Sequence, residues 1–451
     1  MRDFLDEILP ARLKARPLLK DVVTTSLFAI GGRVLGLLIP FFIAFWFGAS
    51  GETDVFFLVY TLVYLVSFVL GDTMGEILIP YFSDIRVKGG NAAVQVGRFF
   101  VFGGVSSALL VALLYVIARR FLPLLVPFSE RQLSLTFAIL GEMAPMVVIL
   151  FWCNILMAFL NAAKRFALPA FSPAIRSTVT ILLIYALKGK LGIHSVALAF
   201  VVGETVRLVV LFWRTYLVEG FPLARDAFMW DSGIFRVATT AFFQSGAKVL
   251  GTINSTVDRV MASWLVVGSV SILYYSDRLE MVATLLLAAG TMNVVVSYWS
   301  ERFSKEGLDR LLKDVKKTGW AMGLVSLGVA LLFALLSKPI VRLVLGHGAM
   351  SREVLEPIRL TLVCYLAGFP FKMVNSILVR TYIVLQRTRI LLLQASVSVF
   401  LNVIFNLVFM KYLGVAGLAL STSSISALSL GFWIWSLWYL RKNSSGEMAR
   451  G

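Results

Sequence analysis

Charged residues are scarce in this 451-residue chain, and their scarcity indicates its class. Asp, Glu, Lys and Arg make up 15% of the sequence, whereas hydrophobic residues make up 59%. Soluble globular proteins carry about 25% charged residues, so the composition is not that of a water-soluble globular protein. It predicts an integral membrane protein.

Cysteine and histidine are also rare, with two of each. Cys153 and Cys364 fall inside apolar runs, and His194 and His347 are far apart in the chain. This set provides neither a disulfide framework nor the ligand cluster of a zinc site. We therefore expect no metal and no cofactor.

Apolar runs of about 20 residues, the length that crosses a bilayer as a helix, recur along the whole sequence. Backbone polar groups must be paired in lipid, and the runs are too long for barrel strands, so an all-α polytopic membrane protein is predicted. The twelve predicted spans are 22–47, 55–82, 98–118, 134–160, 167–187, 193–213, 237–265, 269–298, 319–337, 357–385, 389–411 and 414–440.

Basic residues are distributed unevenly between the two sides of these spans. The net charge is +17, and the segments on the side of the N-terminus hold more than twice as many Lys and Arg residues as those on the other side. The positive-inside rule then places both termini in the cytoplasm. The charge suits an anionic lipid surface, and no nucleic-acid partner is expected because almost no soluble basic surface remains.

The two halves of the chain repeat each other. "GGRVLG" at 31–36 recurs as "GAKVLG" at 246–251, and "LGIHSVALAF" at 191–200 recurs as "LGVAGLALST" at 413–422. Each half has six spans, an even number, so the halves are expected to be lobes related by a parallel repeat with a central cavity between them, as in alternating-access transporters. The predicted parts are an interfacial N-terminal segment at 1–21, an N-lobe at 22–216, a cytoplasmic linker at 217–236, a C-lobe at 237–440 and a cytoplasmic tail at 441–451.

Charged residues inside the spans are costly and usually line an interior cavity. Arg33 lies about 17 Å deep in its predicted helix at 1.5 Å per residue, and it aligns with Lys248 in the repeat. Substrate-binding candidates from this set are Arg33, Lys248, Arg278, Asp72, Asp277, Arg176 and Lys372.

Several of these charges have structural interpretations. Arg33 and Asp72 lie at similar depths, so an ion pair between them is an alternative to a ligand site. Glu204 and Arg207 are three residues apart on one helix and are expected to pair. Asp277 and Arg278 point in different directions and are not expected to neutralise each other.

Lys248 has no obvious acidic neighbour by depth, which favours a ligand contact. Asn375, Asn402 and Asn406 are read as interhelical hydrogen-bonding residues or as sugar contacts. The positive charges favour an anionic, phosphate-bearing head group in the cavity, because a cation exporter is expected to offer unpaired carboxylates.

Four segments resemble the MviN/MurJ-type lipid II flippases of the multidrug/oligosaccharidyl-lipid/polysaccharide exporter superfamily. They are "GRVLG" at 32–36, "FGASGETDVFF" at 47–57, "DRVMASWLVVGSVSILYYSDRL" at 258–279 and "KYLGVAGLALSTS" at 411–423. The resemblance implies a V-shaped cavity that binds the pyrophosphate of an undecaprenyl-linked sugar. Residue by residue, it implies roles for Arg33, Arg278 and Asp54, and a location in the bacterial cytoplasmic membrane.

The sequence also departs from that family. Ile39 and Pro40 stand where the family has an Arg-Asp pair, the stretch 64–70 carries no cation, and twelve spans are predicted where fourteen are usual. Lys248 is a candidate replacement for a missing cation. A lipid-linked exopolysaccharide or O-antigen unit is therefore an alternative substrate to lipid II.

Together with the repeat and the buried charges, this resemblance implies an alternating-access flippase that moves an undecaprenyl-pyrophosphate-linked glycan from the inner to the outer leaflet. No covalent step is needed, so neither catalytic residues nor an enzyme activity is expected. A cation- or proton-coupled small-molecule antiporter of the same superfamily is the main alternative, and a membrane glycan enzyme or scaffold is the third. Whether an ion is coupled to transport is left open.

Overall fold

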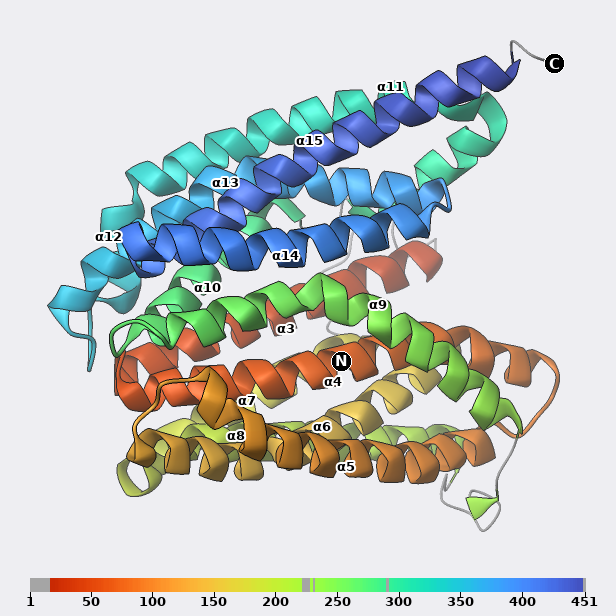
Figure 1. Cartoon of the computed structure of the whole chain (residues 1–451). Helices are drawn as coiled ribbons and strands as arrows, with labels where there is room; N and C mark the ends of the chain where they lie inside the picture. The colour runs from red at the N-terminus through yellow and green to blue at the C-terminus, as the bar shows by residue number, and fades with distance from the viewer. Residues whose placement is uncertain (1–16, 221–227, 230–231, 289–291, 449–451) are drawn as a thin grey trace. The chain divides into compact units, whose positions relative to one another are not determined.

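A computed structural model describes residues 17–220, 228–229, 232–288 and 292–448 as an arrangement of α-helices without strands (Figure 1). The expected interfacial segment lies outside these residues except for 17–21, which belong to the first described helix. The helices are α3 (Pro17–Phe47), α4 (Gly51–Val87), α5 (Ala92–Leu125), α6 (Glu130–Ala162), α7 (Ala167–Leu191), α8 (His194–Glu219), α9 (Ser232–Ala262), α10 (Ser269–Ala288), α11 (Met292–Leu335), α12 (Ser337–Leu345), α13 (Arg352–Val384), α14 (Thr388–Leu413) and α15 (Val415–Met448).

Apart from 269–298, the predicted spans agree with the long helices, and the all-α prediction is confirmed. Ten helices in the described residues are long and apolar enough to cross a membrane. The long helices α9 and α10 are not among the ten, because they are more polar: α9 carries Lys248 together with many uncharged polar residues, and α10 carries Asp277, Arg278 and Glu280. The number of crossings therefore stays a prediction.

The predicted span 269–298 is wrong at its C-terminal end. Helix α10 ends at Ala288, and α11 begins at Met292. The stretch 299–318, which lies between the predicted spans 269–298 and 319–337, is helical as part of α11, with a break at Gly307, whose positive φ of 77° suits glycine. The short α12 was not foreseen as a separate helix.

The helices group into two compact units. Unit 1 comprises Met1–Ile43 and Val55–Val249, and unit 2 comprises Ala44–Asp54 and Leu250–Gly451. Most of α3 and α4 thus belongs to unit 1, while the turn that joins them belongs to unit 2. The lobe boundaries drawn from the repeat remain a prediction.

In unit 1, α6 packs on α5 and α8, and α7 packs on α8. Aromatic side chains of α4, α5 and α6, including Phe82, Phe99 and Phe159, are buried at its core. A side chain at Gly103 of α5 would overlap the Phe151 ring of α6. Close approach through small residues replaces the hydrophobic effect as the source of helix association in lipid.

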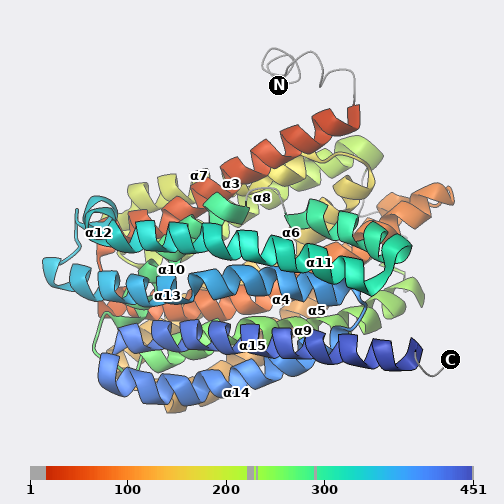
Figure 2. The same ribbon diagram turned by 90° about the horizontal axis from the view of Figure 1, so that it is seen from above.

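In unit 2, α13 packs against α10, α11 and α15, and α14 packs against α15. Helices α11, α13, α14 and α15 run alongside one another in both views (Figures 1 and 2). Trp299 and Leu311 of α11, Tyr382 of α13 and Trp433 of α15 form a buried cluster. This framework holds the polar side chains described next.

Candidate functional site

Arg33 of α3 differs from the other predicted cations in its surroundings. Gly32 and Gly36 let α3 approach α7 closely, opposite Pro173 and Ala174 for Gly32 and opposite Arg176 for Gly36. The Arg33 side chain is exposed, and it forms no ion pair or hydrogen bond with any residue that the structure describes. Among the described residues, no carboxylate therefore neutralises this guanidinium.

Lys248 is paired, so the prediction that it lacks an acidic neighbour is wrong. Its ammonium nitrogen lies 2.5 Å from Asp72 Oδ2 and 3.0 Å from Glu76 Oε1. These two acids are one turn apart on α4, so both face α9, which carries Lys248. The alternative pair of Arg33 with Asp72 is likewise not formed, because Lys248 takes that carboxylate.

Unit 2 contains a polar cavity of about 380 Å³ lined by α9, α10, α13 and α15. Five charged side chains line it, three carboxylates and two cations: Asp258, Arg259, Asp277, Glu280 and Lys372. The cavity is thus polar and charged, as is expected where charged residues inside membrane spans line an interior cavity. The excess of carboxylates differs from the cationic wall that the sequence predicts.

Asp277 is shared by two arginines in this cavity. Arg259 Nη2 lies 3.3 Å and Arg278 Nη2 lies 3.7 Å from its Oδ2 atom. Both guanidinium groups also lie over the Tyr274 ring, at 5.0 and 4.6 Å from its centroid. The prediction that Asp277 and Arg278 do not neutralise each other is wrong, because the long arginine side chain bends back to its neighbour.

Lys372 on α13 bridges to α10. Its ammonium nitrogen donates hydrogen bonds of 3.0 and 2.8 Å to the two carboxylate oxygens of Glu280, which is buried. As a substrate ligand it would have to exchange this carboxylate for a phosphate. Its position in the cavity wall keeps it a candidate.

Asp258 also lines this cavity, and side-chain amides donate hydrogen bonds to it. The side-chain nitrogens of Asn402 and Asn406 donate to its Oδ1 atom at 2.9 and 2.7 Å, and the Thr422 hydroxyl donates to Oδ2 at 3.3 Å. The two asparagines belong to α14 and the aspartate to α9. Of the two readings of these asparagines, the structure supports interhelical hydrogen bonding, and Asn375 likewise donates to the Ser426 carbonyl at 2.7 Å.

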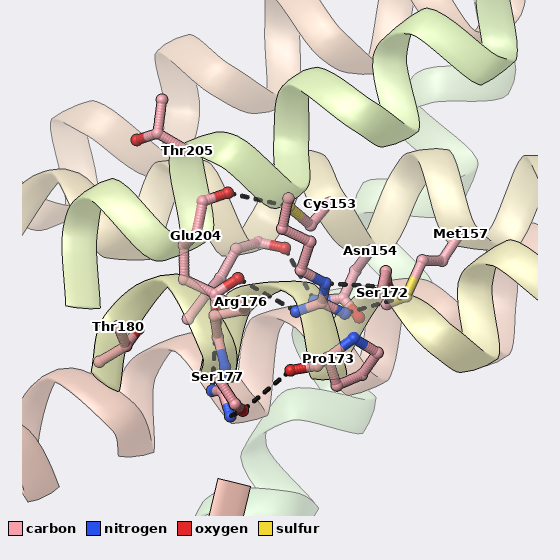
Figure 3. A network of polar contacts seen from close by, with 12 residues as sticks. Cys153, Asn154, Met157, Ser172, Pro173, Arg176, Ser177, Thr180, Glu204 and Thr205 are labelled. Atoms are coloured by element: carbon pink, nitrogen blue, oxygen red, sulfur yellow. Dashed lines mark hydrogen bonds and ion pairs between the residues drawn. The ribbon is translucent and has the colours of Figure 1, made fainter. Parts of the chain in front are cut away.

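Arg176 belongs to a buried network in unit 1 rather than to an open cavity. Glu204 accepts from Arg176 Nη1 at 3.3 Å and from Arg207 Nη1 at 3.1 Å, which confirms the expected pairing of Glu204 with Arg207. Arg207 also donates to Ser172 at 3.0 Å. Figure 3 shows Glu204, Arg176 and Ser172 converging from α7 and α8. The network accounts for Arg176 structurally.

Asp54 also has a structural explanation. Its buried carboxylate accepts hydrogen bonds from the backbone of Gly268 at 2.6 Å and from the backbone and hydroxyl of Ser271 at 2.8 and 2.7 Å. A carboxylate suits the N-terminus of α10, where backbone N–H groups lack partners. Together with the hydrogen bond of 2.8 Å from the Tyr275 hydroxyl to the Gly48 carbonyl, it attaches the turn between α3 and α4 to α10 within unit 2.

Sequence reasoning missed Asp258 and Arg259 as site residues and did not foresee Glu76 as a partner of Lys248. Asp258 and Arg259 begin the segment "DRVMASW", inside a predicted span, so a charge within an apolar span was the signal that could have identified them.

Among the residues that the structure describes, no group of three or more His, Cys, Asp or Glu side chains is placed to hold a metal ion.

Comparison with known proteins identifies the family. A family model described as "Lipid II flippase MurJ" matches residues 43–450. A probable lipid II flippase MurJ of Vibrio cholerae is 24% identical over 435 residues, which cover 92% of this chain and 82% of that protein. The lipid II flippase MurJ of Thermosipho africanus is 26% identical over 413 residues, with coverages of 90% and 82%.

Solved structures share the fold. A lipid II flippase MurJ in an inward closed conformation matches with a TM-score of 0.75 and 24% identity over 91% of this chain and 87% of that one. An inward-facing multidrug resistance MATE family transporter matches with a TM-score of 0.71 and 13% identity over 93% and 96%. The chain, a multi-pass membrane protein, belongs to the lipid II flippase MurJ family.

Proposed function

We propose that this protein is a flippase that moves a polyprenyl-diphosphate-linked glycan, lipid II or a related polysaccharide repeat unit, from the inner to the outer leaflet of the bacterial cytoplasmic membrane. Its membership of the MurJ family supports the substrate class. The observation that carries the proposal is Arg33, an exposed guanidinium in an apolar helix with no partner among the described residues.

A charge at this depth costs at least 2.5–3.5 kcal/mol on insertion scales. A diphosphate offsets that cost well, because a planar guanidinium binds phosphate oxygens with two parallel hydrogen bonds. Lipid II and related carriers supply this diphosphate. An anion at Arg33 would also leave the sugar and the polyprenyl chain free to lie elsewhere.

The paired cations fit the proposal through exchange of partners. The Asp72 and Glu76 side chains are 46% and 60% exposed, so water can take over these carboxylates when a phosphate takes Lys248. Arg278 is 23% exposed and shares Asp277 with Arg259. We propose Lys248 and Arg278 as further phosphate ligands. Each would exchange its carboxylate, Asp72 for Lys248 and Asp277 for Arg278, for a phosphate oxygen, and Lys372 is a neighbouring cation in the cavity wall. Arg176 and Asp54 are assigned structural roles instead.

We further propose cytoplasmic termini and transport driven by the membrane potential. About two negative charges moving outward gain about 4–5 kcal/mol per 100 mV of inside-negative potential. A coupling ion would make transport depend on that ion at zero potential, which ion-free proteoliposomes test directly. No covalent chemistry is part of the cycle.

Cation- or proton-coupled antiport of a small molecule is the second candidate. The observation that favours it is the excess of carboxylates over cations in the unit 2 cavity. Efflux of cationic dyes by the purified protein, driven by a proton or sodium gradient, would support it over the flippase.

The test of the flippase is transport of a fluorescent undecaprenyl-diphosphate-linked sugar by purified protein in proteoliposomes, with leaflet position read by a membrane-impermeant quencher. We expect transport by the wild type and its loss in R33E and R278E, at normal expression. The control is R389E, which reverses an exposed cation at the start of α14. Wild-type turnover in both R33E and R278E would refute the assigned roles.

A further inference from the structure

A second, strongly basic cavity lies in unit 2, away from the charges discussed so far. It has a volume of about 510 Å³ and is formed by α12, the turn after it and the first turns of α13; we call it the α12–α13 cavity. Its charged lining residues are Lys338, Arg342, Arg352, Glu356 and Arg359, and His347 completes the polar wall.

Its positive charge is largely uncompensated. Glu356 is the single carboxylate in the lining, and it is already engaged by Arg359, whose Nε atom lies 2.9 Å from both carboxylate oxygens. Lys338, Arg342 and Arg352 form no ion pair with any residue in the described part of the chain. Three cations facing one cavity repel one another unless an anion joins them.

The backbone around the cavity is held in place. The Ala349 N–H donates to the Phe45 carbonyl at 2.8 Å, which ties the turn after α12 to the end of α3. Gly348 has φ of 70° and approaches Phe45 so closely that a side chain there would clash. Val341 and Leu345 of α12 are buried, which anchors this short helix in unit 2. The cations therefore project from a fixed frame rather than from a loose loop.

Apolar side chains exposed beside these cations point to a lipid surface. Leu335, Leu336 and Leu343 are 81%, 44% and 76% exposed, on or next to α12. A short helix that exposes both leucines and cations is typical of a segment lying in the membrane interface. The orientation predicted from the sequence places α12 and the start of α13 on the outer side of the membrane, where the positive-inside rule disfavours Lys and Arg. A concentration of these cations on that side indicates a ligand.

We propose that the α12–α13 cavity is a binding site for the phosphate group of an anionic membrane lipid. Lys338, Arg342 and Arg352 supply the charge-assisted hydrogen bonds to the phosphate oxygens. The exposed leucines contact the adjacent acyl chains. The site uses none of the residues assigned to transport, so it goes beyond the proposed flippase activity.

The test measures lipid binding by the full-length protein in detergent, using native mass spectrometry. The probe is phosphatidic acid, and the control lipid is phosphatidylcholine, which has no net charge. Each cation near a membrane surface contributes about 1 kcal/mol, which is about a fivefold change in affinity. We therefore expect R342Q to bind phosphatidic acid about fivefold more weakly, and R342Q/R352Q about 30-fold more weakly. Neither should change binding of phosphatidylcholine.

Two further variants make the result specific. E356Q removes the negative charge of the cavity and releases Arg359, so it should bind phosphatidic acid about fivefold more tightly. The matched control K188Q/K190Q removes two cations from the last turn of α7 and should bind as the wild type does.

The proposal is overturned if R342Q/R352Q binds phosphatidic acid within twofold of the wild type, or if K188Q/K190Q weakens binding equally. Inorganic pyrophosphate distinguishes the source of the anion. If pyrophosphate at equal concentration does not displace phosphatidic acid, the site binds a lipid. Full displacement would assign the site to a soluble anion and overturn the lipid assignment.

Discussion

Glu204 is the carboxylate that two buried arginines of unit 1 share, and E204Q tests whether their network is structural. The Glu204 side chain is fully buried, and those of Arg176 and Arg207 are 16% and 8% exposed. Glutamine keeps the shape but leaves two guanidinium charges without their carboxylate. Removing one partner of a buried ion pair typically costs 3–5 kcal/mol, so we expect E204Q to lower the free energy of unfolding by about that amount.

Unfolding by SDS in mixed micelles, followed by tryptophan fluorescence, measures this difference. D84N is the matched control, because Asp84 forms an exposed ion pair with Lys88 and such pairs contribute only about 0–1 kcal/mol. Replacing all three network residues, in R176M/E204L/R207M, removes the charges together and should leave stability within about 2 kcal/mol of the wild type. An E204Q protein as stable as D84N would refute the structural role of the network.

Four other variants test three individual contacts by the same unfolding measurement. D54A removes the acceptor for Gly268 and Ser271 at the start of α10 and should cost about 1–3 kcal/mol; no loss would mean that α10 does not depend on this cap. K372M leaves Glu280 buried without its ammonium partner and should destabilise by about 3–5 kcal/mol, while E280Q/K372M should recover most of that loss; equal losses in both would contradict the pairing. G348A places a side chain in a left-handed turn against α3 and should cost at least about 1 kcal/mol, and an unchanged stability would show that the turn is not held as described.

The helices were predictable because lipid demands long apolar runs, and such runs are visible in the sequence. The Glu204–Arg207 pair was predictable for a similar reason, since residues three apart on a helix are neighbours. Arg176 joins that pair only through the packing of α7 on α8. No local sequence pattern predicts the contact between Arg176 and Glu204.

The errors concern partners distant in the sequence. Depth along a helix follows from residue number, but the direction in which a side chain points relative to another helix does not. The sequence therefore predicts an unpaired Lys248, although Asp72 and Glu76 both contact it. Asp54 caps a helix more than 200 residues away, a role that a family motif alone does not distinguish from ligand binding.

The most direct test of the account is whether Arg33 binds the diphosphate of the substrate. Affinity for an undecaprenyl-diphosphate-linked sugar would be compared among the wild type, R33K, R33Q and the control R389Q. A charge-assisted hydrogen bond contributes about 1.5–3 kcal/mol, so R33Q should bind about 10- to 150-fold more weakly. R33K, a point charge without the planar fork, should lie between R33Q and the wild type. Equal affinities of R33Q and the wild type would contradict the proposal that Arg33 binds phosphate.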